Sequence, residues 1–222
     1  MGPRILRIGL PVMEKNDRLA ARNRGLFEKS GLYAVNIIGS PGTGKTSLLE
    51  AMARVLGKSL VVIEGDVQTR RDAERIEKAG CTAFQIETGG ACHLDAGMVS
   101  KAAAGLGLEG RGFEVLAIEN VGNLICPSSY DLGEHTKLGI LSVTEGDDKV
   151  LKYPSIFSRI GILVTSKIDL LPHVGFDIGR VEAECRSLNP DVLCFRTSAT
   201  TGEGVGDLCR HILSERKRVL RA

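Results

Sequence analysis

The sequence contains no tryptophan, and aromatic residues make up only 4% of its 222 residues. Aromatic platforms on which the bases of a single-stranded nucleic acid stack are therefore scarce. A net charge of +2 adds no electrostatic reason to expect a nucleic acid. No apolar run approaches the roughly 18 residues that a membrane-spanning helix requires, and the first residues lack the apolar region of a signal peptide. We therefore predict a cytoplasmic protein that has no nucleic-acid or membrane partner.

The six cysteines of the chain show no spacing that is typical of a zinc finger. Because disulfides are rare in the reducing cytoplasm, each cysteine should fill the core, bind metal or remain a reactive thiol. Those in or beside apolar stretches are expected in the core: Cys81, Cys185, Cys194 and Cys209. Single histidines in polar segments show no partner: His135, His173 and His211.

Short β-rich apolar runs recur along the chain and alternate with stretches of helical character. A length of 222 residues suits one α/β domain that buries roughly three-quarters of the unfolded chain's surface. Strands are expected at residues 33–38, 60–63, 82–86, 115–118, 138–143, 160–164 and 192–195. Helices are expected at residues 14–29, 47–56, 69–79, 95–108, 177–188 and 204–217. Strands without polar alternation predict a three-layer α/β fold, in which helices flank a mostly parallel sheet.

A glycine-rich motif at residues 39–46 is the strongest functional signal in the chain. It matches the pattern G-x-x-x-x-G-K-S/T between an expected strand and an expected helix. In that context, glycines let backbone N–H groups surround a phosphate at the positive end of the helix. Lys45 is expected to reach the β- and γ-phosphates, and the Thr46 hydroxyl to bind Mg²⁺. The motif predicts a P-loop NTPase fold and these nucleotide contacts: Gly39, Gly42, Thr43, Gly44, Lys45, Thr46 and Ser47.

Acidic residues end the second and fourth expected strands, at the sheet edge where ligands bind. At the first of these ends, Asp66 could approach Mg²⁺ or position the attacking water; a carboxylate that caps a turn is the alternative. At the other, Glu119 is expected to hold Mg²⁺ through water, and Gly122 to offer its N–H to the γ-phosphate. The expected catalytic residues are Lys45, Asp66 and Glu119, with Thr46, Asp66 and Glu119 around Mg²⁺.

The stretch from Ser166 to Asp169 resembles the guanine-reading N-K-x-D element of GTPases. The Asp169 carboxylate can accept from guanine N1–H and N2–H₂, a donor pair that adenine lacks, so discrimination against ATP could reach about 10⁴-fold. Lys167 would lay its aliphatic stem over the base. Ser166 replaces an asparagine whose longer amide bridges to the phosphate loop, which predicts weaker nucleotide binding. Ser198 and Ala199 lie in a stretch similar to the S-A-K loop, where the Ala199 N–H would meet guanine O6.

Two cysteines and a histidine form a second candidate site. Cys92 and His93 lie in a loop before a helix that Asp95 can cap, and Cys126 follows Glu119 by seven residues. Two thiolates and an imidazole suit Zn²⁺ or Ni²⁺. The alternative, which the residues leave open, is that these cysteines are small buried hydrophobic groups.

Together, these stretches resemble the HypB-type hydrogenase nickel-incorporation GTPases, a SIMIBI-class family of P-loop GTPases. The resemblance extends from about residue 14 to the C-terminus, at residues 39–46, 64–67, 72–76, 92–96, 119–127, 131–134 and 142–146. It is specific because Cys92, His93 and Cys126 accompany the GTPase elements. It implies a GTPase with a domain at residues 31–222, and an N-terminal helical extension at residues 1–30 that packs on it. Hydrolysis should be slow, because no glutamine positioned for the attacking water and no arginine finger is identifiable in the sequence.

The resemblance also implies a homodimer that GTP strengthens, with nucleotide near the subunit interface. Cys92, His93 and Cys126 would bind Ni²⁺ or Zn²⁺, and two such sets would meet across that interface. The implied function is delivery of Ni²⁺ to the large-subunit precursor of NiFe-hydrogenase, together with a HypA-type metallochaperone. Residues 1–11 contain neither Cys nor His, so nickel capture there is not expected. We expect the nucleotide state to control metal affinity through residues 119–126.

Three other functions compete with this one. A urease-type nickel-delivery GTPase would share the fold, the nucleotide and a nearby metal, although the pair Cys92 and His93 favours the hydrogenase type. A small-molecule P-loop kinase would keep Lys45 but would give Asp169 no base to bind. A regulator that binds GTP without turnover is the third. Lys149 could reach the nucleotide of a second subunit or be a solvated surface lysine.

Overall fold

The structure of the protein is a computed structural model that describes residues 10–66 and 71–221. The side chains of residues 10–12, 66 and 71 are outside this description as well. The predicted role of the Asp66 side chain and the predicted helix start at residue 69 therefore concern parts outside the described residues. The same holds for residues 1–9 of the predicted extension.

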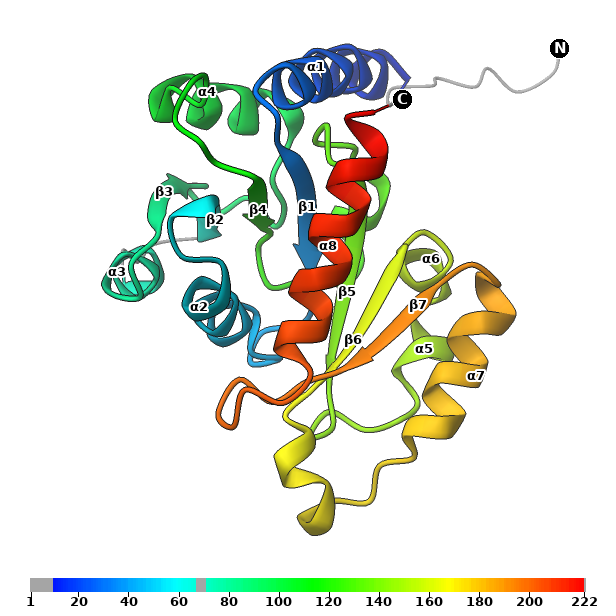
Figure 1. Ribbon diagram of the computed structural model, residues 1–222. Coiled ribbons are helices and arrows are strands. Elements are labelled where there is room, and N and C mark those ends of the chain that lie inside the picture. The colour runs from blue at the N-terminus through cyan, green and yellow to red at the C-terminus, as the bar shows by residue number, and fades with distance from the viewer. Residues whose placement is uncertain (1–9, 67–70, 222) are drawn as a thin grey trace, which may run out of the picture.

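Seven parallel strands form one sheet, which confirms the predicted α/β fold (Figure 1). The strand order is β3-β2-β4-β1-β5-β6-β7. The strands are β1 (Tyr33–Ile38), β2 (Leu60–Asp66), β3 (Thr82–Glu87), β4 (Val115–Glu119), β5 (Thr136–Ser142), β6 (Ile162–Ser166) and β7 (Leu193–Arg196). Strand β1 pairs with β4 on one side and with β5 on the other. The carboxyl end of β1, where the glycine-rich motif begins, therefore lies in the middle of the sheet edge.

Helices cover both faces of the sheet and give the molecule three layers (Figure 1). α2, α3 and α8 pack on one face, whereas α1, α4, α5, α6 and α7 pack on the other. The α-helices are α1 (Leu10–Lys29), α2 (Lys45–Leu56), α3 (Arg71–Lys78), α4 (Ala96–Leu106), α5 (Lys149–Lys152), α6 (Pro154–Phe157), α7 (Ile178–Leu188) and α8 (Val205–Val219). Short 3-10 helices are η1 (Gly57–Ser59), η2 (Cys126–Ser129) and η3 (Ile168–His173). None of the described helices is both long and apolar enough to span a membrane.

Successive residues of the central strand enter different cores, which is why β1 has no polar face. Val35 and Ile37 pack with α2 and α8, whereas Ala34 packs with α1 and α4. Ile38 enters a third core with α5, α6 and α7. All six residues of β1 are buried. A strand covered by helices on both sides cannot show the apolar–polar alternation of a half-exposed strand.

Helix α1 lies beside α4 on one face of the sheet (Figure 1). It ends at Lys29, the predicted end of this helix, and Gly31, with a φ of 73°, turns the chain into β1. Phe27 of α1 is fully buried in a core that it shares with Ala34 of β1 and Val99 of α4. The division of the chain at residue 30 stays a prediction.

The sixth strand begins and ends two residues later than predicted, at Ile162–Ser166. It continues because its ladder with β5 includes the pairs Leu141–Thr165 and Ser142–Ser166. Thr165 and Ser166 are buried although they are polar, so an apolar run does not reveal them. The helices α5 and α6 were not predicted either, because four residues are too few to show a helical period.

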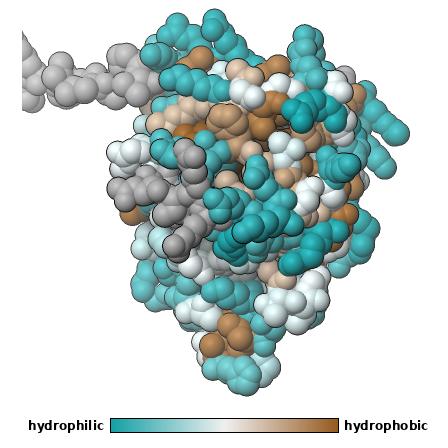
Figure 2. Space-filling model, turned by 90° about the vertical axis from the view of Figure 1, so that its left-hand side faces the viewer, coloured by the Kyte–Doolittle hydropathy of each residue, from teal (hydrophilic) through white to brown (hydrophobic). Residues whose placement is uncertain are grey.

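Figure 2 shows the face formed by the left-hand side of Figure 1. Hydrophobic side chains gather in the upper half of this face, and hydrophilic side chains cover most of the lower half. On this side of the molecule, Phe84 and Ile86 of the edge strand β3 and Met98 of α4 are half-buried and pack against the core beneath α1. Two side chains of the edge strand are therefore partly covered by this core.

Candidate functional site

The glycine-rich motif forms the turn between β1 and α2. Gly42 (φ 81°) and Gly44 (φ 91°) adopt left-handed conformations that glycine tolerates. A Cβ at Gly39 would lie 2.5 Å from Cγ2 of Ile140, so β5 approaches too closely for any other residue there. Lys45 begins α2, and its Nζ donates to the Gly39 carbonyl at 3.3 Å. This is the strand–loop–helix geometry that aims backbone N–H groups at a phosphate.

A hollow of about 520 Å³ opens beside this loop at the carboxyl ends of the strands. The structure brings most of the predicted phosphate and Mg²⁺ contacts together in its walls. They are Gly42, Gly44, Lys45, Thr46, Ser47, Glu119 and Gly122. The hollow therefore joins the glycine-rich motif to the end of β4.

Glu119 and Thr46 face each other in this hollow. The Thr46 hydroxyl donates to Oε1 of Glu119 at 2.9 Å, and Oε2 is buried without a hydrogen-bond partner among the described residues. Burial raises the pKa of Glu119 to about 7, although Lys45 acts in the opposite direction. Burial also lowers the pKa of Lys45. A buried carboxylate oxygen without a donor, beside a hydroxyl, fits a divalent cation, which would favour the ionised form of Glu119.

Three charged residues of the hollow were not assigned from the sequence. Glu64 lines the hollow two residues before Asp66 and is only 2% exposed. Arg75 and Asp72 of α3 also line it; Arg75 forms ion pairs with Glu50 at 2.8 Å and with Asp72 at 3.0 Å. The spacing of Asp72 and Arg75 predicts an ion pair on one helix face. Their position beside α2 depends on tertiary packing, which the sequence does not show.

A second hollow, of about 250 Å³, adjoins the first, and Gly44 and Lys167 line both. Thr43, Asp169 and Ala199 line it too. The residues predicted to contact a guanine base thus surround one space next to the phosphate loop. The size and position of the two hollows match a nucleotide that lies with its phosphates on the loop and its base between β6 and the loop before α8.

Ser166 does bridge to the phosphate loop, contrary to the sequence prediction. Its hydroxyl donates to the Thr43 carbonyl at 2.7 Å, and both residues are buried. The prediction was wrong because β6 ends close to the phosphate loop. The short serine hydroxyl therefore reaches the Thr43 carbonyl, and the longer amide of an asparagine is not needed. Lys167 adds a second link, since its Nζ donates to the Gly42 carbonyl at 2.7 Å. Its backbone is left-handed, with a φ of 58°.

Ser198 supports the base-side hollow and does not line it. It is fully buried, and its hydroxyl accepts from the Thr201 N–H at 3.1 Å. Its own N–H donates to the Glu203 carbonyl at 3.0 Å. These bonds close the loop that carries Ala199, so Ser198 fixes the position of the Ala199 backbone.

Cys92, His93 and Cys126 lie together, with their ligand atoms all within 4.8 Å of one another. A hydrogen bond with Cys126 raises the pKa of the Cys92 thiol. Burial lowers the pKa of His93, which favours the neutral imidazole that binds metal. As predicted, Asp95 caps α4 by accepting from the Met98 N–H at 2.8 Å. Two thiols and an imidazole at these separations can supply three ligands of a tetrahedral metal site.

The other cysteines are buried as predicted, except that Cys194 is half-buried. His135 has partners that the sequence did not reveal. Its Nδ1 accepts from the Ala34 N–H at 2.8 Å, and its ring stacks on Tyr33 with centroids 4.9 Å apart. Its Nε2 lies 3.7 Å from Glu28. His135 is therefore a structural residue at the start of the central strands.

Lys149 is held within its own chain. Its Nζ lies 3.5 Å from Oε1 of Glu145 and 5.6 Å from the centre of the Tyr153 ring. The side chain is 23% exposed. A contact between Lys149 and the nucleotide of a second subunit stays a prediction.

Comparisons with known proteins agree on one family. Residues 33–196 match the family model described as CobW/HypB/UreG, nucleotide-binding domain. The chain is 50% identical over 222 residues to hydrogenase maturation factor HypB of Azotobacter vinelandii, covering 99% of this chain and 72% of that one. It is 43% identical over 209 residues to hydrogenase/urease maturation factor HypB of Helicobacter pylori, covering 93% and 86%. Among solved structures, HypB from Helicobacter pylori in complex with nickel is similar, with a TM-score of 0.88, 41% identity and coverage of 93% and 97%.

Replacing Ser166 with alanine should weaken GDP binding about tenfold, because the buried Thr43 carbonyl would lose its donor. Ser166→Asn should bind GDP as the wild type does, since an amide can donate to the same carbonyl. Titration calorimetry measures both affinities. Ser187→Ala is the matched control, because the Ser187 hydroxyl also donates to a backbone carbonyl, that of Glu184, but on α7. An unchanged affinity in Ser166→Ala would contradict the expected role of this bridge.

The raised pKa of Glu119 predicts that Mg²⁺-dependent GDP binding weakens in acid. Below a pKa of about 7, binding of the cation must release the Glu119 proton. The Mg²⁺-dependent affinity should therefore be about tenfold lower at pH 6 than at pH 8. Glu119→Gln should bind GDP more weakly in the presence of Mg²⁺. Its affinity should not change over this pH range, although the charged residues Lys45, Asp72 and Arg75 still line the hollow. Nucleotide titrations over this pH range test the point, and a flat wild-type profile would refute it.

Proposed function

The chain belongs to the CobW/HypB/UreG family, and from that premise we propose that it is a GTP-hydrolysing metallochaperone for nickel insertion during maturation of NiFe-hydrogenase. One observation carries this proposal. Glu119 and Gly122 line the phosphate hollow, and Cys126, at the end of the same stretch, lies with Cys92 and His93. A nucleotide site and a site for a thiophilic metal are thus joined by a single short segment of chain.

Guanine is the base that the second hollow suits. The Asp169 carboxylate can accept from guanine N1–H and N2–H₂, and the Ala199 N–H can donate to guanine O6. Adenine would present an amino group to the Ala199 N–H and leave Asp169 without its donor pair. Lys167, tied to the Gly42 carbonyl, stands where its stem can cover the base. The Asp169 carboxylate and the Ala199 N–H therefore favour GTP over ATP.

The protein is a GTPase, and we assign its residues as follows. Lys45 stabilises the charge that develops on the β- and γ-phosphate oxygens, and the Gly122 N–H binds the γ-phosphate. The Thr46 hydroxyl and, through water, Glu119 would hold Mg²⁺, which would supply further neutralisation of those oxygens. Asp66, at the end of β2, is the candidate that orients the attacking water.

We expect slow intrinsic hydrolysis, because the described residues that line the hollow include no free arginine to stabilise the transition state. Arg75 is the only arginine among the described residues that line it. Its guanidinium is held by Glu50 and Asp72. A group that stays paired with carboxylates cannot act as an arginine finger without first breaking those ion pairs.

Nickel is the cargo, and we propose Cys92, His93 and Cys126 as its ligands. Two thiolates and an imidazole bind both Ni²⁺ and Zn²⁺. Cys92 is exposed and Cys126 is half-buried, so metal can reach the cluster from solvent. Three protein ligands leave a coordination position for a ligand of the recipient, which a transfer of metal requires.

The partners follow from the same proposal. The protein acts as a homodimer that GTP strengthens, a HypA-type metallochaperone works with it, and the large-subunit precursor of NiFe-hydrogenase receives the metal. The relatives named hydrogenase maturation factors support this assignment. Urease is a second candidate recipient, because the Helicobacter pylori relative is named a hydrogenase/urease maturation factor. A cytoplasmic location suits six cysteines that are all free.

A direct contact links the nucleotide loop to the metal cluster. Gly39, the first residue of the glycine-rich motif, forms an isolated antiparallel bridge with Asn123. The Asn123 side chain donates to the Cys92 carbonyl at 3.3 Å and accepts from the Ile125 N–H at 2.9 Å. A Cβ at Gly122 would lie 3.0 Å from the motif's proline ring, so this segment packs directly on the loop. A nucleotide that moves the loop would therefore move both thiols, and its state would change the metal affinity.

The purified protein should release phosphate from GTP slowly and bind GDP about 10⁴-fold more tightly than ADP. Lys45→Ala should abolish phosphate release, and Asp169→Asn should lose most of the preference for GDP. Phosphate-release assays and titration calorimetry measure these effects. Asp191→Asn, an exposed acid on the turn before β7, is the control for charge. Equal affinities for GDP and ADP would remove the guanine assignment, and phosphate transfer to a small acceptor would indicate a kinase.

The Asn123 side chain should carry the coupling between nucleotide and metal. We expect the Ni²⁺ affinities of the GDP-bound and the non-hydrolysable-GTP-bound wild type to differ by about 5-fold or more. Asn123→Ala should bring the two affinities closer together, because the Cys92 carbonyl loses its link to the Gly39 bridge. Competition with a coloured chelator measures them, and Cys194→Ala serves as a control for the loss of a thiol. Identical affinities in the two states of the wild type would refute the coupling.

A further inference from the structure

Two segments carry the proposed metal ligands: residues 92–96, the Cys92 segment, and residues 125–132, the Cys126 segment. Asparagines hydrogen-bond to both segments from two directions. Asn123 does so from the nucleotide side, as described above. Asn16 and Asn23 do so from the opposite side, on α1. Because some thirty residues separate the two segments in sequence, the distance between their thiols depends on such cross-links.

The α1 asparagines are buried, and each bonds to both segments. Asn16 is 5% exposed; its amide donates to the Asp131 carbonyl at 2.8 Å and its oxygen accepts from the Ala96 N–H at 2.9 Å. Asn23 is 2% exposed, and its amide donates to the carbonyls of Ala96 and Leu132, both at 2.9 Å. The two asparagines are seven residues apart, which places them on one face of the helix two turns apart. Each therefore connects the Cys92 segment with the Cys126 segment through α1.

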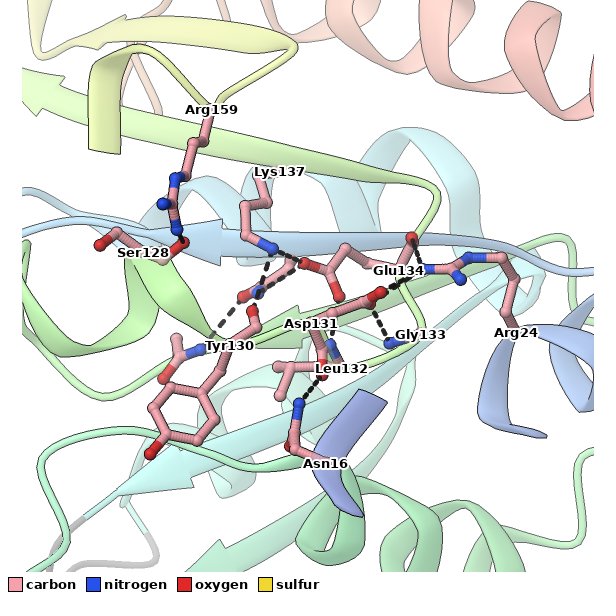
Figure 3. Close-up of polar contacts among 12 residues, drawn as sticks. Asn16, Arg24, Ser128, Tyr130, Asp131, Leu132, Gly133, Glu134, Lys137 and Arg159 are labelled. Atoms are coloured by element: carbon pink, nitrogen blue, oxygen red, sulfur yellow. Dashed lines mark hydrogen bonds and ion pairs between the residues drawn. The ribbon is translucent and has the colours of Figure 1, made fainter. Parts of the chain in front are cut away.

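The Cys126 segment is held against α1 at its far end as well, as Figure 3 shows. Arg24 donates to both carboxylate oxygens of Asp131 at 2.8 Å, and the Gly133 N–H donates to Asp131 Oδ1 at 2.8 Å. A Cβ at Gly133 would lie 2.6 Å from Cβ of Asn23 and 2.7 Å from the Ala20 carbonyl oxygen. The chain therefore approaches the α1 backbone as closely as only glycine allows.

The ligands themselves are near these anchoring points. Ala96 follows His93 by three residues, and the His93 ring lies on the Tyr130 ring with centroids 4.0 Å apart. Tyr130 immediately precedes Asp131, which Asn16 and Arg24 hold. Loss of these links to α1 would therefore allow a displacement of His93 relative to Tyr130. Metal–ligand distances are fixed to a few tenths of an ångström, so such a displacement changes the affinity.

We propose that Asn16 and Asn23 are positioning residues of the metal site, which set the separation of Cys92 and Cys126 independently of the nucleotide. This inference rests on the proposed function, because it requires Cys92, His93 and Cys126 to be the ligands. The site then has two supports of different kinds. Asn123 connects it to the phosphate loop and responds to the nucleotide, whereas the α1 asparagines connect it to a helix whose described side chains line neither nucleotide hollow.

The test measures Ni²⁺ affinity of the full chain in Asn16→Ala and Asn23→Ala, with GDP and with a non-hydrolysable GTP analogue. Each variant should bind Ni²⁺ about 10- to 100-fold more weakly than the wild type, by the same factor in both nucleotide states. The thiolate-to-nickel charge-transfer bands should shift, while GDP affinity stays unchanged. Asn189→Ala is the matched control: the Asn189 side chain also bonds two backbone groups, those of Ile160 and Asp191, and neither of these belongs to a ligand segment.

Two further variants keep the outcomes distinct. Asn16→Asp keeps the acceptor for the Ala96 N–H and loses the donor to the Asp131 carbonyl, so it should weaken Ni²⁺ binding even if an alanine variant fails to fold. Cys126→Ala tests the ligands: unchanged Ni²⁺ affinity there would overturn the proposed function itself. If Cys126→Ala loses Ni²⁺ but the asparagine variants match the wild type in affinity and spectrum, the positioning role is overturned alone. A loss of GDP affinity equal to the loss of Ni²⁺ affinity would also overturn it.

Discussion

The contact between Gly39 and Asn123 is the constraint on which the proposed coupling between nucleotide and metal depends. Gly39 cannot carry a side chain, because Ile140 approaches it too closely. The start of the phosphate loop is therefore held in one position against β5. The bridge to Asn123 transfers that position to the chain that leads to Cys126. Thr46 and Glu119, which hydrogen-bond to each other, fix the other end of the same stretch. The segment is therefore held beside the nucleotide hollow at two points, and a displacement of the phosphate loop can reach the thiols through it.

Buried amides give the Cys92 segment and the Cys126 segment a single arrangement. Asn120, 1% exposed, accepts from the Leu94 N–H at 3.0 Å and donates to Asn36 in the central strand at 3.2 Å. Asn36, fully buried, donates in turn to Glu134 at 3.2 Å, and Glu134 pairs with Lys137. A buried polar group destabilises the fold unless its partners are present. Because these groups bond to one another, any other position of the Cys92 segment would leave several of them unpaired.

The features that depend on neighbouring residues followed from the sequence: the glycine-rich loop, the seven strands and the Asp95 cap. Features that depend on distant residues did not. The Ser166–Thr43 bridge spans 123 residues, the His135–Ala34 bond 101, and the Asn16–Asp131 bond 115. Asn16 and Asn23 lie in a polar helix, where asparagine ordinarily faces solvent, so no local pattern marks them. Likewise, the residues alone left the Cys92 and Cys126 thiols as either core groups or ligands, and only the family resemblance favoured a common site before the structure placed them together.

Two supports suit a site that must both hold and release its metal. Linkage requires that a nucleotide which changes Ni²⁺ affinity by some factor has its own affinity changed by Ni²⁺ to the same extent. A cluster held by α1 alone would bind metal equally well in every nucleotide state, and GTP would have no influence on it. A cluster held through Asn123 alone would respond to the nucleotide but would lose its ligand geometry whenever the phosphate loop moved. In the proposed arrangement with both supports, α1 would maintain the affinity common to the two states, and the short path from Gly39 through Asn123 to the Cys92 carbonyl would supply the difference between them.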